Sequence, residues 1–384
     1  MKFWKRALCL GLGALLAASA LPVTAGALSE EDLTAPSAVL MEASTGKVLF
    51  EKSSHEVRAC ASITKVMTLL LVMEAIDQGR MSLTDTITAS EHASSMGGSD
   101  IWLEPGETMS ADDMVKATVV ASANDAAVAL AEHLEGTEEA FVQKMNQRAA
   151  ELGMKDTVFK NCNGLDEEGH VTSAYDVALM SRELIKHEKI FDYTTIWMDT
   201  LREGKTQIVN TNKLLKSYNG ITGLKTGTTG GAGICISASA TRNGLSLIAV
   251  ILGAPSSADR FDAATTLLDY GFGAYEAAPL PKLEAQPLQI TVRGSAAGSV
   301  PLDYSALPET VLVEKGSGAS LYTELTLPEE LEAPVEQGQT LGKAAVYQGK
   351  ALLEEYEVRA AADAPRMTVR DAIGLLWQSL TGAA

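Results

Sequence analysis

Cysteines and metal-binding patterns are sparse in this sequence of 384 residues. It holds four cysteines, and one of them, Cys9, lies in the N-terminal segment discussed below. The other three are an odd number, so at most one disulfide can form and a disulfide-stapled scaffold is excluded. The five histidines show no H-x-x-x-H or H-E-x-x-H spacing, so a zinc hydrolase has little support. We therefore expect no metal and no cofactor.

Basic residues and long apolar runs are also in short supply. Lys and Arg number 31 against 49 Asp and Glu, which gives a formal net charge of -18. A chain this acidic is a poor partner for a phosphate backbone, so nucleic acid is disfavoured. After the N-terminus, no stretch reaches the length that spans a bilayer.

The first 27 residues have the features of a secretory signal. Three positive charges precede an apolar run over 7–21, and Ala25-Gly26-Ala27 supplies an A-x-A cleavage pattern. The run is too short and too rich in small residues for a good membrane span. We expect the mature protein to work outside the cytoplasm, either secreted or peripherally attached to the outer face of the cell membrane.

The rest of the chain predicts an α+β fold. Apolar periodicity predicts strands near both ends of the first 275 residues and helices between them. This pattern favours an antiparallel sheet with flanking helices and a helical subdomain, of the β-lactamase/transpeptidase-like kind. Short alternating stretches then predict a small all-β domain, and a last helix carries an apolar stripe at Val369, Ile373, Leu376 and Leu380. The expected parts are a signal peptide at 1–27, a larger domain at 28–278, a β-rich domain at 279–360, and a linker with an amphipathic helix at 361–384.

The strongest candidate for chemistry is the stretch Cys60–Leu71. No Gly or Pro occurs from Ser62 to Ile76, and the dense apolar residues predict a buried helix with Ser62 as its cap. Lys65 shares the face of Ser62 one turn away. Burial and nearby positive charge lower a lysine pKa toward a free amine, which can act as base for a hydroxyl nucleophile. The alternative is a serine cap with a snorkelling lysine.

Two further clusters have the residue types that such a site needs. Ser122 and Asn124 lie at a predicted helix junction, where a hydroxyl and an amide can point into one cavity or simply cap a helix. The stretch Lys225-Thr226-Gly227-Thr228 places a cation, two hydroxyls and a glycine along one strand edge. Glycine there lets a substrate backbone approach closely, although a Gly-rich turn at a strand entry has the same composition.

The order of the three clusters matches a known signature. Ser-x-x-Lys is followed after 60 residues by Ser-x-Asn and after about 100 more by Lys-Thr-Gly. With these motifs the sequence resembles the low-molecular-mass penicillin-binding proteins, the serine-type D-alanyl-D-alanine carboxypeptidases of peptidase family S11. The resemblance covers about residues 35–275, and it includes the stretches 38–47, 122–126, 163–170 and 267–272. The small β domain and the terminal helix continue the family layout.

The resemblance implies a catalytic cycle. Ser62 would attack the carbonyl between the two terminal D-alanines of a peptidoglycan stem peptide, Lys65 would take its proton, and water would hydrolyse the resulting ester. Ser122 would relay the proton to the leaving amine. Penicillin and other β-lactams would acylate the same serine.

The resemblance also implies the substrate-binding residues, which would be Asn124, Lys225, Thr226, Gly227, Thr228 and Arg260. Lys225 would in addition depress the pKa of Lys65. The backbone N–H groups of Ser62 and Thr228 would hold the oxyanion. Arg260 would face the terminal carboxylate of the substrate, unless it is a surface arginine at a helix start.

Two cysteines depart from the family pattern. Cys60 and Cys162 stand where the family usually has proline, in two loops expected to border the active site. We hypothesise that the two cysteines form a disulfide in the oxidising environment outside the cytoplasm. Two independent small replacements are the alternative.

Competing functions would require different sequence features. A class A β-lactamase shares the motifs but needs a deacylating Glu in a Glu-x-x-Leu-Asn stretch, and residues 161–166 contain none. Transpeptidation with an amine acceptor stays open, and a silent wall-binding module is disfavoured by the three intact motifs.

The family often uses its terminal helix as a membrane-surface anchor. Here residues 367–384 have Arg370 as their one basic residue, so packing on the β domain is the alternative.

Overall fold

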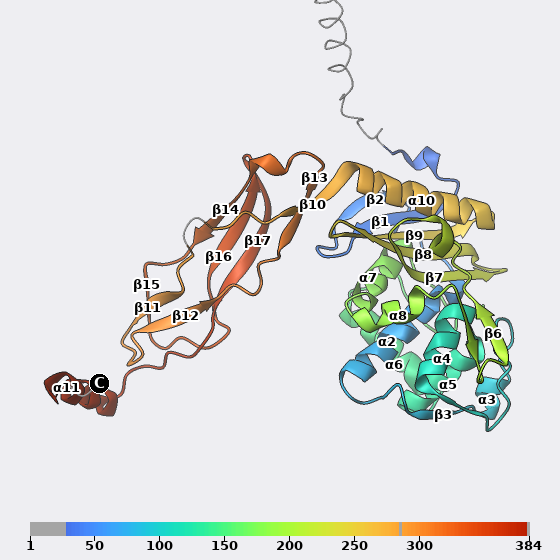
Figure 1. The fold of residues 1–384 in the computed structure, drawn as a ribbon, viewed down its shortest axis with the longest axis horizontal. Coiled ribbons are helices and arrows are strands. Elements are labelled where there is room, and N and C mark those ends of the chain that lie inside the picture. The colour runs from blue at the N-terminus through green and yellow to red at the C-terminus, as the bar shows by residue number, and fades with distance from the viewer. Residues whose placement is uncertain (1–27, 284–285, 382–384) are drawn as a thin grey trace, which may run out of the picture. The chain divides into compact units, whose positions relative to one another are not determined.

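The computed structural model describes residues 28–283 and 286–381, so the signal peptide expected at 1–27 lies outside the described residues. The chain forms two compact units. The first holds the residues up to Arg242 together with Ser246–Ala274, and the second holds Asn243–Leu245 and the residues from Tyr275 onward. The predicted fold class is confirmed, because an antiparallel sheet carries helices in the first unit and strands dominate the second (Figure 1).

A five-stranded sheet in the order β2-β1-β9-β8-β7 is the frame of the first unit. The N-terminal hairpin joins strands from late in the chain, since Val39 on β1 lies opposite Val250 on β9. Helix α10 contacts one face and α7 the other (Figure 1). The five strands are β1 (Ser37–Glu42), β2 (Val48–Lys52), β7 (Ile221–Thr229), β8 (Gly233–Arg242) and β9 (Leu245–Ala254). Because β7 is an edge strand, one row of its backbone N–H groups has no strand partner.

Most helices of this unit lie between β2 and β7 in the chain. They are α2 (Lys65–Asp77), α3 (Glu91–Ser94), α4 (Ala111–Lys116), α5 (Asn124–Glu135), α6 (Glu138–Glu151), α7 (Ala174–Leu184), α8 (Phe191–Thr194) and α9 (Leu214–Ser217), with α10 (Ser257–Ala274) after the sheet. Two small hairpins accompany them, β3 (Thr86–Thr88) with β4 (Thr108–Ser110), and β5 (Met198–Leu201) with β6 (Thr206–Val209).

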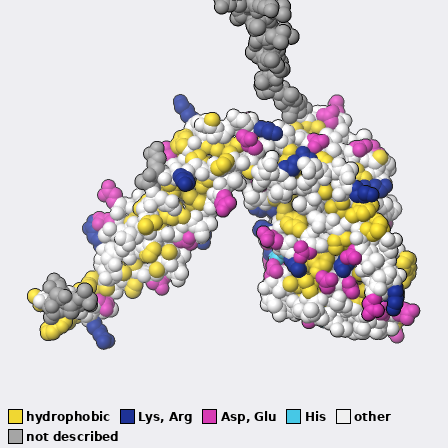
Figure 2. All heavy atoms as spheres, in the orientation of Figure 1, with side chains coloured by type: hydrophobic (Ala, Val, Ile, Leu, Met, Phe, Trp, Pro, Cys, Tyr) yellow, Lys and Arg dark blue, Asp and Glu magenta, His cyan; other side chains and the backbone are white. Residues whose placement is uncertain are grey.

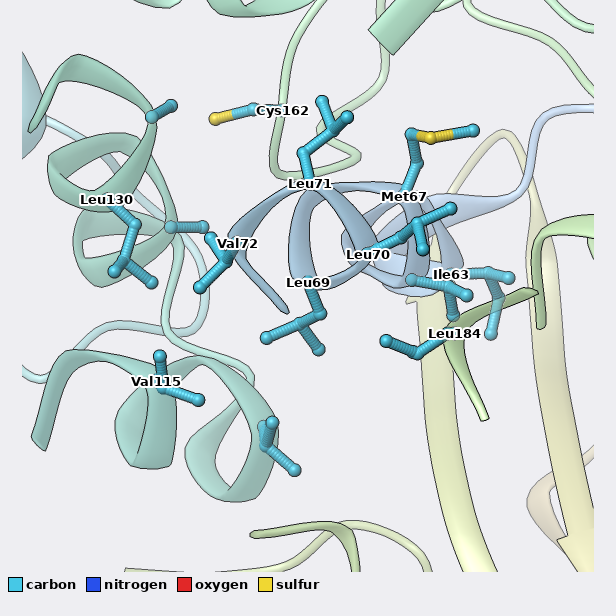
Figure 3. Close-up of a cluster of buried hydrophobic side chains, with 14 of the residues drawn as sticks. Ile63, Met67, Leu69, Leu70, Leu71, Val72, Val115, Leu130, Cys162 and Leu184 are labelled. Atoms are coloured by element: carbon cyan, nitrogen blue, oxygen red, sulfur yellow. The ribbon is translucent and has the colours of Figure 1, made fainter. Parts of the chain in front are cut away.

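Helix α2 passes through the middle of the helical core. Every residue from Lys65 to Met73 is buried, so this part of the helix has no face exposed to solvent. Figure 3 shows its side chains among Val115 of α4, Leu130 of α5 and Leu184 of α7. Burial of each large apolar side chain contributes about 1.5–3 kcal/mol, which holds the first turn of α2 in a rigid setting.

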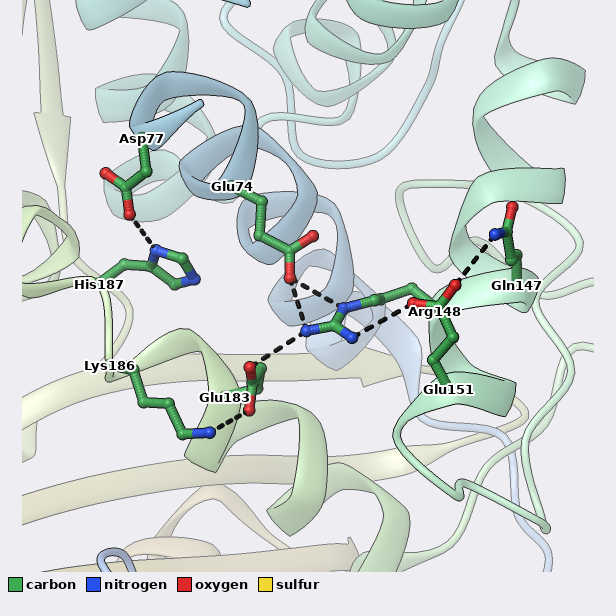
Figure 4. A network of polar contacts seen from close by, with 8 residues as sticks. All are labelled: Glu74, Asp77, Gln147, Arg148, Glu151, Glu183, Lys186 and His187. Atoms are coloured by element: carbon green, nitrogen blue, oxygen red, sulfur yellow. Dashed lines mark hydrogen bonds and ion pairs between the residues drawn. The ribbon is translucent and has the colours of Figure 1, made fainter. Parts of the chain in front are cut away.

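A network of charges joins the outer ends of three helices. Arg148 on α6 donates to Glu74 on α2, to Glu183 on α7 and to Glu151 one turn along its own helix (Figure 4). Lys186 adds a bond to Glu183. The network therefore ties α2, α6 and α7 together.

The second unit is built mainly from short strands. A six-stranded sheet runs in the order β14-β16-β17-β12-β11-β15, and β10 pairs with β13. The strands are β10 (Tyr275–Pro279), β11 (Gln289–Arg293), β12 (Ser299–Asp303), β13 (Thr310–Glu314), β14 (Leu321–Thr326), β15 (Glu330–Glu332), β16 (Thr340–Gln348) and β17 (Ala351–Ala360). Helix α11 (Val369–Thr381) ends the described chain, and hydrophobic side chains lie on its surface at the lower left of Figure 2.

Candidate active site

Ser62 lies in a tight turn just before α2. The prediction that Ser62 caps the helix is wrong, because residues Ala61–Thr64 form a 3-10 turn and the α-helix begins at Lys65. Ala61 has φ of +51°, in the left-handed region that a residue with a side chain rarely adopts. A side chain at Gly164 would come within 2.0 Å of the Ala61 carbonyl oxygen, and one at Gly227 within 2.9 Å of the Ser62 nitrogen. The two glycines let backbone approach the turn from both sides.

Lys65 is fully buried and surrounded by oxygen atoms. Its Nζ lies 3.0 Å from Ser62 Oγ, 2.5 Å from Asn124 Oδ1 and 2.7 Å from the Asn163 carbonyl oxygen. Burial lowers the pKa of Lys65 to about 7, although the charges of Asp100 and Asp125 act in the opposite direction. A neutral amine has two N–H donors for the two carbonyl oxygens and one lone pair. That lone pair faces the only partner that carries a proton, the Ser62 hydroxyl.

Ser122 ends an irregular stretch of helix. Residues Ala117–Ala121 form a π-helical turn, and Ser122 follows in the left-handed conformation with φ of +61°. Turns of this kind are frequent at functional sites. Lys225 Nζ donates to Ser122 Oγ over 2.9 Å and to the Thr226 carbonyl oxygen over 2.9 Å. Lys225 therefore leaves the Ser122 proton free to point elsewhere.

The three cations of the site influence one another. Burial is the largest cause of the lowered pKa of Lys65. The pKa of Lys225 lies well below its ordinary value, first because of burial and then because of the charges of Lys65 and Arg260. Because the repulsion between two like charges is mutual, each amine disfavours the protonated form of the other.

Asn124 is held between Lys65 and a neighbouring loop. Its Oδ1 accepts from Lys65, and its Nδ2 donates to the Gly97 carbonyl oxygen over 2.6 Å. The backbone N–H of Asn124 donates to the Ser99 carbonyl oxygen, which fastens the same loop to the start of α5. The orientation of this amide is thus set on both sides.

The residues predicted on β7 line one strand in register with β8. Thr226 Oγ1 lies 2.5 Å from Thr211 Oγ1, and Thr228 Oγ1 donates to the Gly227 carbonyl oxygen. Gly227 provides the close approach to the Ser62 nitrogen described above. Strand β7 thus brings its free edge to the nucleophile.

Arg260 on α10 reaches the back of the same strand. Its Nη1 donates to the carbonyl oxygens of Cys235 and Gly227 over 3.1 and 3.4 Å, and its Nε is buried without a partner. Arg260 is 7% exposed, so it is not the surface arginine that was the alternative. The prediction that it faces the terminal carboxylate of the substrate stays a prediction.

The hypothesised disulfide is not formed. Cys60, Cys162 and Cys235 are all buried free thiols. The Cys60 thiol lies 3.3 Å from Thr64 Oγ1. Cys162 lies beside Leu71 of α2 in Figure 3, and its pKa is influenced by the charges of Glu138 and Lys65. Burial raises the pKa of Cys60 to about 12 and that of Cys162 well above its ordinary value, so neither thiol is reactive at neutral pH.

Three residues of the site escaped the sequence analysis. Asn163 accepts from Lys65 through its backbone carbonyl, a group that every residue has. Asp166 joins its loop to the end of β7, since it accepts from Thr229 Oγ1 over 2.6 Å and from the Gly231 N–H over 3.0 Å. His170 contacts Thr64 within the nucleophile turn. The glycine-punctuated loop 161–170 was the one available signal, and it pointed to the region but not to these contacts.

Within the described residues, the protein has neither a cluster suited to a metal ion nor a helix that could span a membrane. No cluster of three or more His, Cys, Asp or Glu side chains suited to a metal ion occurs among residues 28–283 and 286–381. In the same part of the chain, every helix is too short or too polar to cross a bilayer. The arrangement of Ser62, Lys65, Ser122 and Lys225 is suited to acyl transfer by a serine hydroxyl with an amine as base.

Known proteins share both parts of this architecture. Residues 24–256 match the family model described as D-alanyl-D-alanine carboxypeptidase, and residues 288–366 match the C-terminal domain of penicillin-binding protein 5. The chain is 45% identical over 333 residues to the D-alanyl-D-alanine carboxypeptidase DacF of Bacillus subtilis (strain 168), covering 86% of this chain and 85% of the relative.

Solved structures agree with the sequence matches. Penicillin-binding protein 5 from Haemophilus influenzae superposes with a TM-score of 0.77 at 28% identity, covering 88% of this chain and all of that one. Penicillin-binding protein D2 from Listeria monocytogenes, solved in an ampicillin-bound form, gives a TM-score of 0.57 at 33% identity over 62% of this chain and 98% of its own. The likeness therefore extends over the sheet, the helices and the β-rich unit.

Proposed function

The chain belongs to the D-alanyl-D-alanine carboxypeptidase family and is a penicillin-binding D-alanyl-D-alanine carboxypeptidase of cell-wall peptidoglycan, and from this premise we propose that Ser62 is its nucleophile and Lys65 its general base. The buried amine of Lys65 carries the proposal. With two carbonyl oxygens occupying its donors, its lone pair is directed at Ser62 Oγ from 3.0 Å. A general base needs this hydrogen-bond distance and a pKa near the working pH.

Acylation then proceeds with each proton accounted for. Ser62 Oγ forms a bond to the carbonyl carbon between the two terminal D-alanines, and its proton passes to Lys65. The C–N bond breaks, and the leaving amine takes a proton from Ser122. The proton that Lys65 took from Ser62 then replaces it on Ser122, so both groups return to their starting states. Because Lys225 already donates to Ser122 Oγ, the Ser122 proton is directed away from it. Terminal D-alanine departs and an ester stays on Ser62.

Water completes the cycle through the same groups. Lys65 takes a proton from the attacking water, the ester C–O bond breaks, and Ser62 regains its hydroxyl. The shortened stem peptide leaves with a new carboxylate. Each step uses a proton acceptor of pKa near neutrality, which is the range that burial gives to Lys65.

The negative charge of the substrate has matching groups on β7. Arg260 brings positive charge to the strand, Lys225 brings N–H donors, and Thr226 and Thr228 bring hydroxyls. We assign them to the terminal carboxylate of the substrate, with Asn124 contacting the acyl part. The Ser62 N–H and the Thr228 N–H are assigned to the oxyanion, where removal of one donor typically costs about 2.7–4 kcal/mol.

Intact-protein mass spectrometry after incubation with penicillin tests the nucleophile. We expect one adduct, located on Ser62, and none on the S62A variant, together with release of D-alanine from a peptide ending in D-Ala-D-Ala. Rapid penicillin turnover without release of D-alanine would instead indicate a β-lactamase. A wild-type protein without any adduct would favour a wall-binding module.

We also propose that α11 contacts the outer surface of the cell membrane. Val369, Ile373, Leu376 and Trp377 are each 61–78% exposed, which is unusual for large apolar side chains of one helix. Interfacial helices bury such a face in the headgroup region. Vesicle co-sedimentation of the protein expressed without residues 1–27, with and without 367–384, tests this. Equal binding of both forms would contradict the proposal, and the secreted alternative would then hold.

A further inference from the structure

A histidine outside the three motifs contacts the nucleophile turn from behind. His170 is 4% exposed and lies at the end of the loop 161–170, where its backbone N–H donates to the Glu167 carbonyl oxygen. Its ring meets Phe159 edge-on at 5.9 Å between centroids. The next residue, Val171, pairs with Val158 in an isolated bridge. Both the backbone and the ring of His170 are therefore held in place.

The contacts of the ring define its tautomer. His170 Nδ1 accepts from the backbone N–H groups of Lys160 and Asn161 over 3.1 and 3.4 Å. A nitrogen that faces two donors must be unprotonated, so the proton lies on Nε2. Burial lowers the pKa of His170 to about 4, which leaves the ring neutral at pH 7. Nε2 therefore donates to its partner, Thr64 Oγ1, over 2.7 Å.

Thr64 passes this orientation on to the residue before the nucleophile. Its side chain is fully buried, and Oγ1 donates to the Ala61 carbonyl oxygen over 2.9 Å. Because a hydroxyl has a single proton, Thr64 can donate to Ala61 only if His170 donates to it. Ala61 holds the left-handed φ of +51°, a strained conformation that persists only under restraint from its surroundings.

We propose that His170 is a positioning residue for acylation, which holds Ser62 in its reactive orientation through a directed hydrogen-bond relay from His170 Nε2 through Thr64 Oγ1 to the Ala61 carbonyl. The relay rests on the proposed function, because it presupposes that Ser62 is the nucleophile. It differs from that function in needing no contact with the substrate. The donor on Nε2 is the essential part, and the ring as a filler of space is not.

Two substitutions separate the donor from the acceptor of the ring. In H170Q, the side-chain amide can donate to Thr64 in place of Nε2. In H170N, the shorter amide can accept from the backbone N–H groups in place of Nδ1 but does not reach Thr64. We expect H170Q to keep the rate of acylation by fluorescent penicillin within threefold. We expect H170N to lose about 10²-fold, the usual cost of a nucleophile displaced by about 1 Å.

Steady-state kinetics with a D-Ala-D-Ala peptide should divide in the same way. H170N should lower kcat and leave KM unchanged, because the binding residues on β7 stay in place. A second pair tests the relay at its middle: T64S keeps the hydroxyl and should acylate nearly as fast as wild type, whereas T64V should fall as far as H170N. This pair carries the test should a His170 variant fail to fold, which thermal unfolding detects.

Several outcomes would overturn the relay. Equal acylation rates in H170N and wild type would do so, as would equal losses in H170Q and H170N or in T64S and T64V. Such results with normal labelling of the wild type would leave the proposed function intact. A wild-type protein that penicillin does not label would overturn the proposed function and the relay together.

Discussion

The cations of the active site and the cations of the outer helical network have opposite kinds of partners. Lys65, Lys225 and Arg260 donate to hydroxyl and carbonyl oxygens, and within the described residues none of them forms an ion pair. Arg148, by contrast, bonds to three carboxylates, and Lys186 shares one of them. The first group is buried without a directly paired carboxylate, whereas the cations of the second group contact carboxylates, as Figure 4 shows.

The difference explains what each region does. A buried amine without a paired carboxylate loses its proton easily, so Lys65 can serve as a base, whereas the guanidinium of Arg260 keeps its charge beside β7 and attracts a carboxylate. A compensated guanidinium stays charged and holds three helices together. One chain therefore uses the same class of residue for reactivity in one place and for stability in another.

The largest expected effect comes from removing the uncompensated amine. K65M keeps similar volume and apolar character but has no proton acceptor. We expect the rate of penicillin acylation to fall by at least about 10²–10⁴-fold, the contribution of a general base. Thermal unfolding should change little, because a buried amine without counter-charge adds little to folding. A K65M protein that acylates at the wild-type rate would refute the role of Lys65.

A carboxylate placed beside Lys65 should give the active site the kind of charge pairing that the outer helical network has. In N124D a carboxylate replaces the amide oxygen that lies 2.5 Å from Lys65 Nζ. An opposite charge at this distance raises a lysine pKa by about 1–3 units, so the acylation rate should drop at pH 7 and recover at alkaline pH. The control N124A removes the amide without adding charge and should lower the rate without moving the pH profile. Identical profiles for the two variants would contradict this account.

The pH profile of the wild-type protein follows from the same pKa. Acylation should rise as the pH passes through about 7, where Lys65 loses its proton. The group also affects stability, because its pKa is lower in the folded state than in the unfolded state. Between about pH 7 and its ordinary value of 10.5 the unfolded chain binds the extra proton, so the contribution of Lys65 to stability rises with pH in that window.

The sequence predicted the parts of this site whose chemistry lies in side chains. Ser62, Lys65, Ser122 and Lys225 could be named because each lies in a short motif with a defined chemical need, and the structure brings them together. Local pattern also predicted most helices, since α5 and α6 carry clear apolar periods. The hairpin of β5 and β6 has no such period, because its two four-residue strands mix polar and apolar residues.

What could not be predicted depends on directions in space. The Asn163 carbonyl and the left-handed Ala61 are backbone features that no side-chain pattern encodes. The Cys60–Cys162 disulfide failed for the same reason: two loops near one site can still point their thiols at different neighbours.

Breaking the compensated network should change stability and not catalysis. R148M leaves Glu74 and Glu183 facing each other without their shared cation. Loss of one partner from a buried ion pair costs about 3–5 kcal/mol. Because the Arg148 side chain is 22% exposed, we expect about 2 kcal/mol, a value reduced for screening by solvent. Denaturant unfolding measures the loss, and penicillin acylation at 25 °C should stay within twofold of wild type.

The smallest expected effect sharpens the comparison within the network itself. Lys186 lies 2.5 Å from Glu183 but is 55% exposed, so water already screens the pair. We expect K186A to cost less than about 1 kcal/mol, the range of surface ion pairs. Burial raises the pKa of Glu183, but Lys186 and Arg148 together bring it below its ordinary value of 4.5, so their contribution is lost as the pH falls below that value and through the lower folded-state pKa. If K186A destabilised the protein as much as R148M, neither the exposure of the cation nor the number of carboxylates that it contacts would explain its contribution to stability.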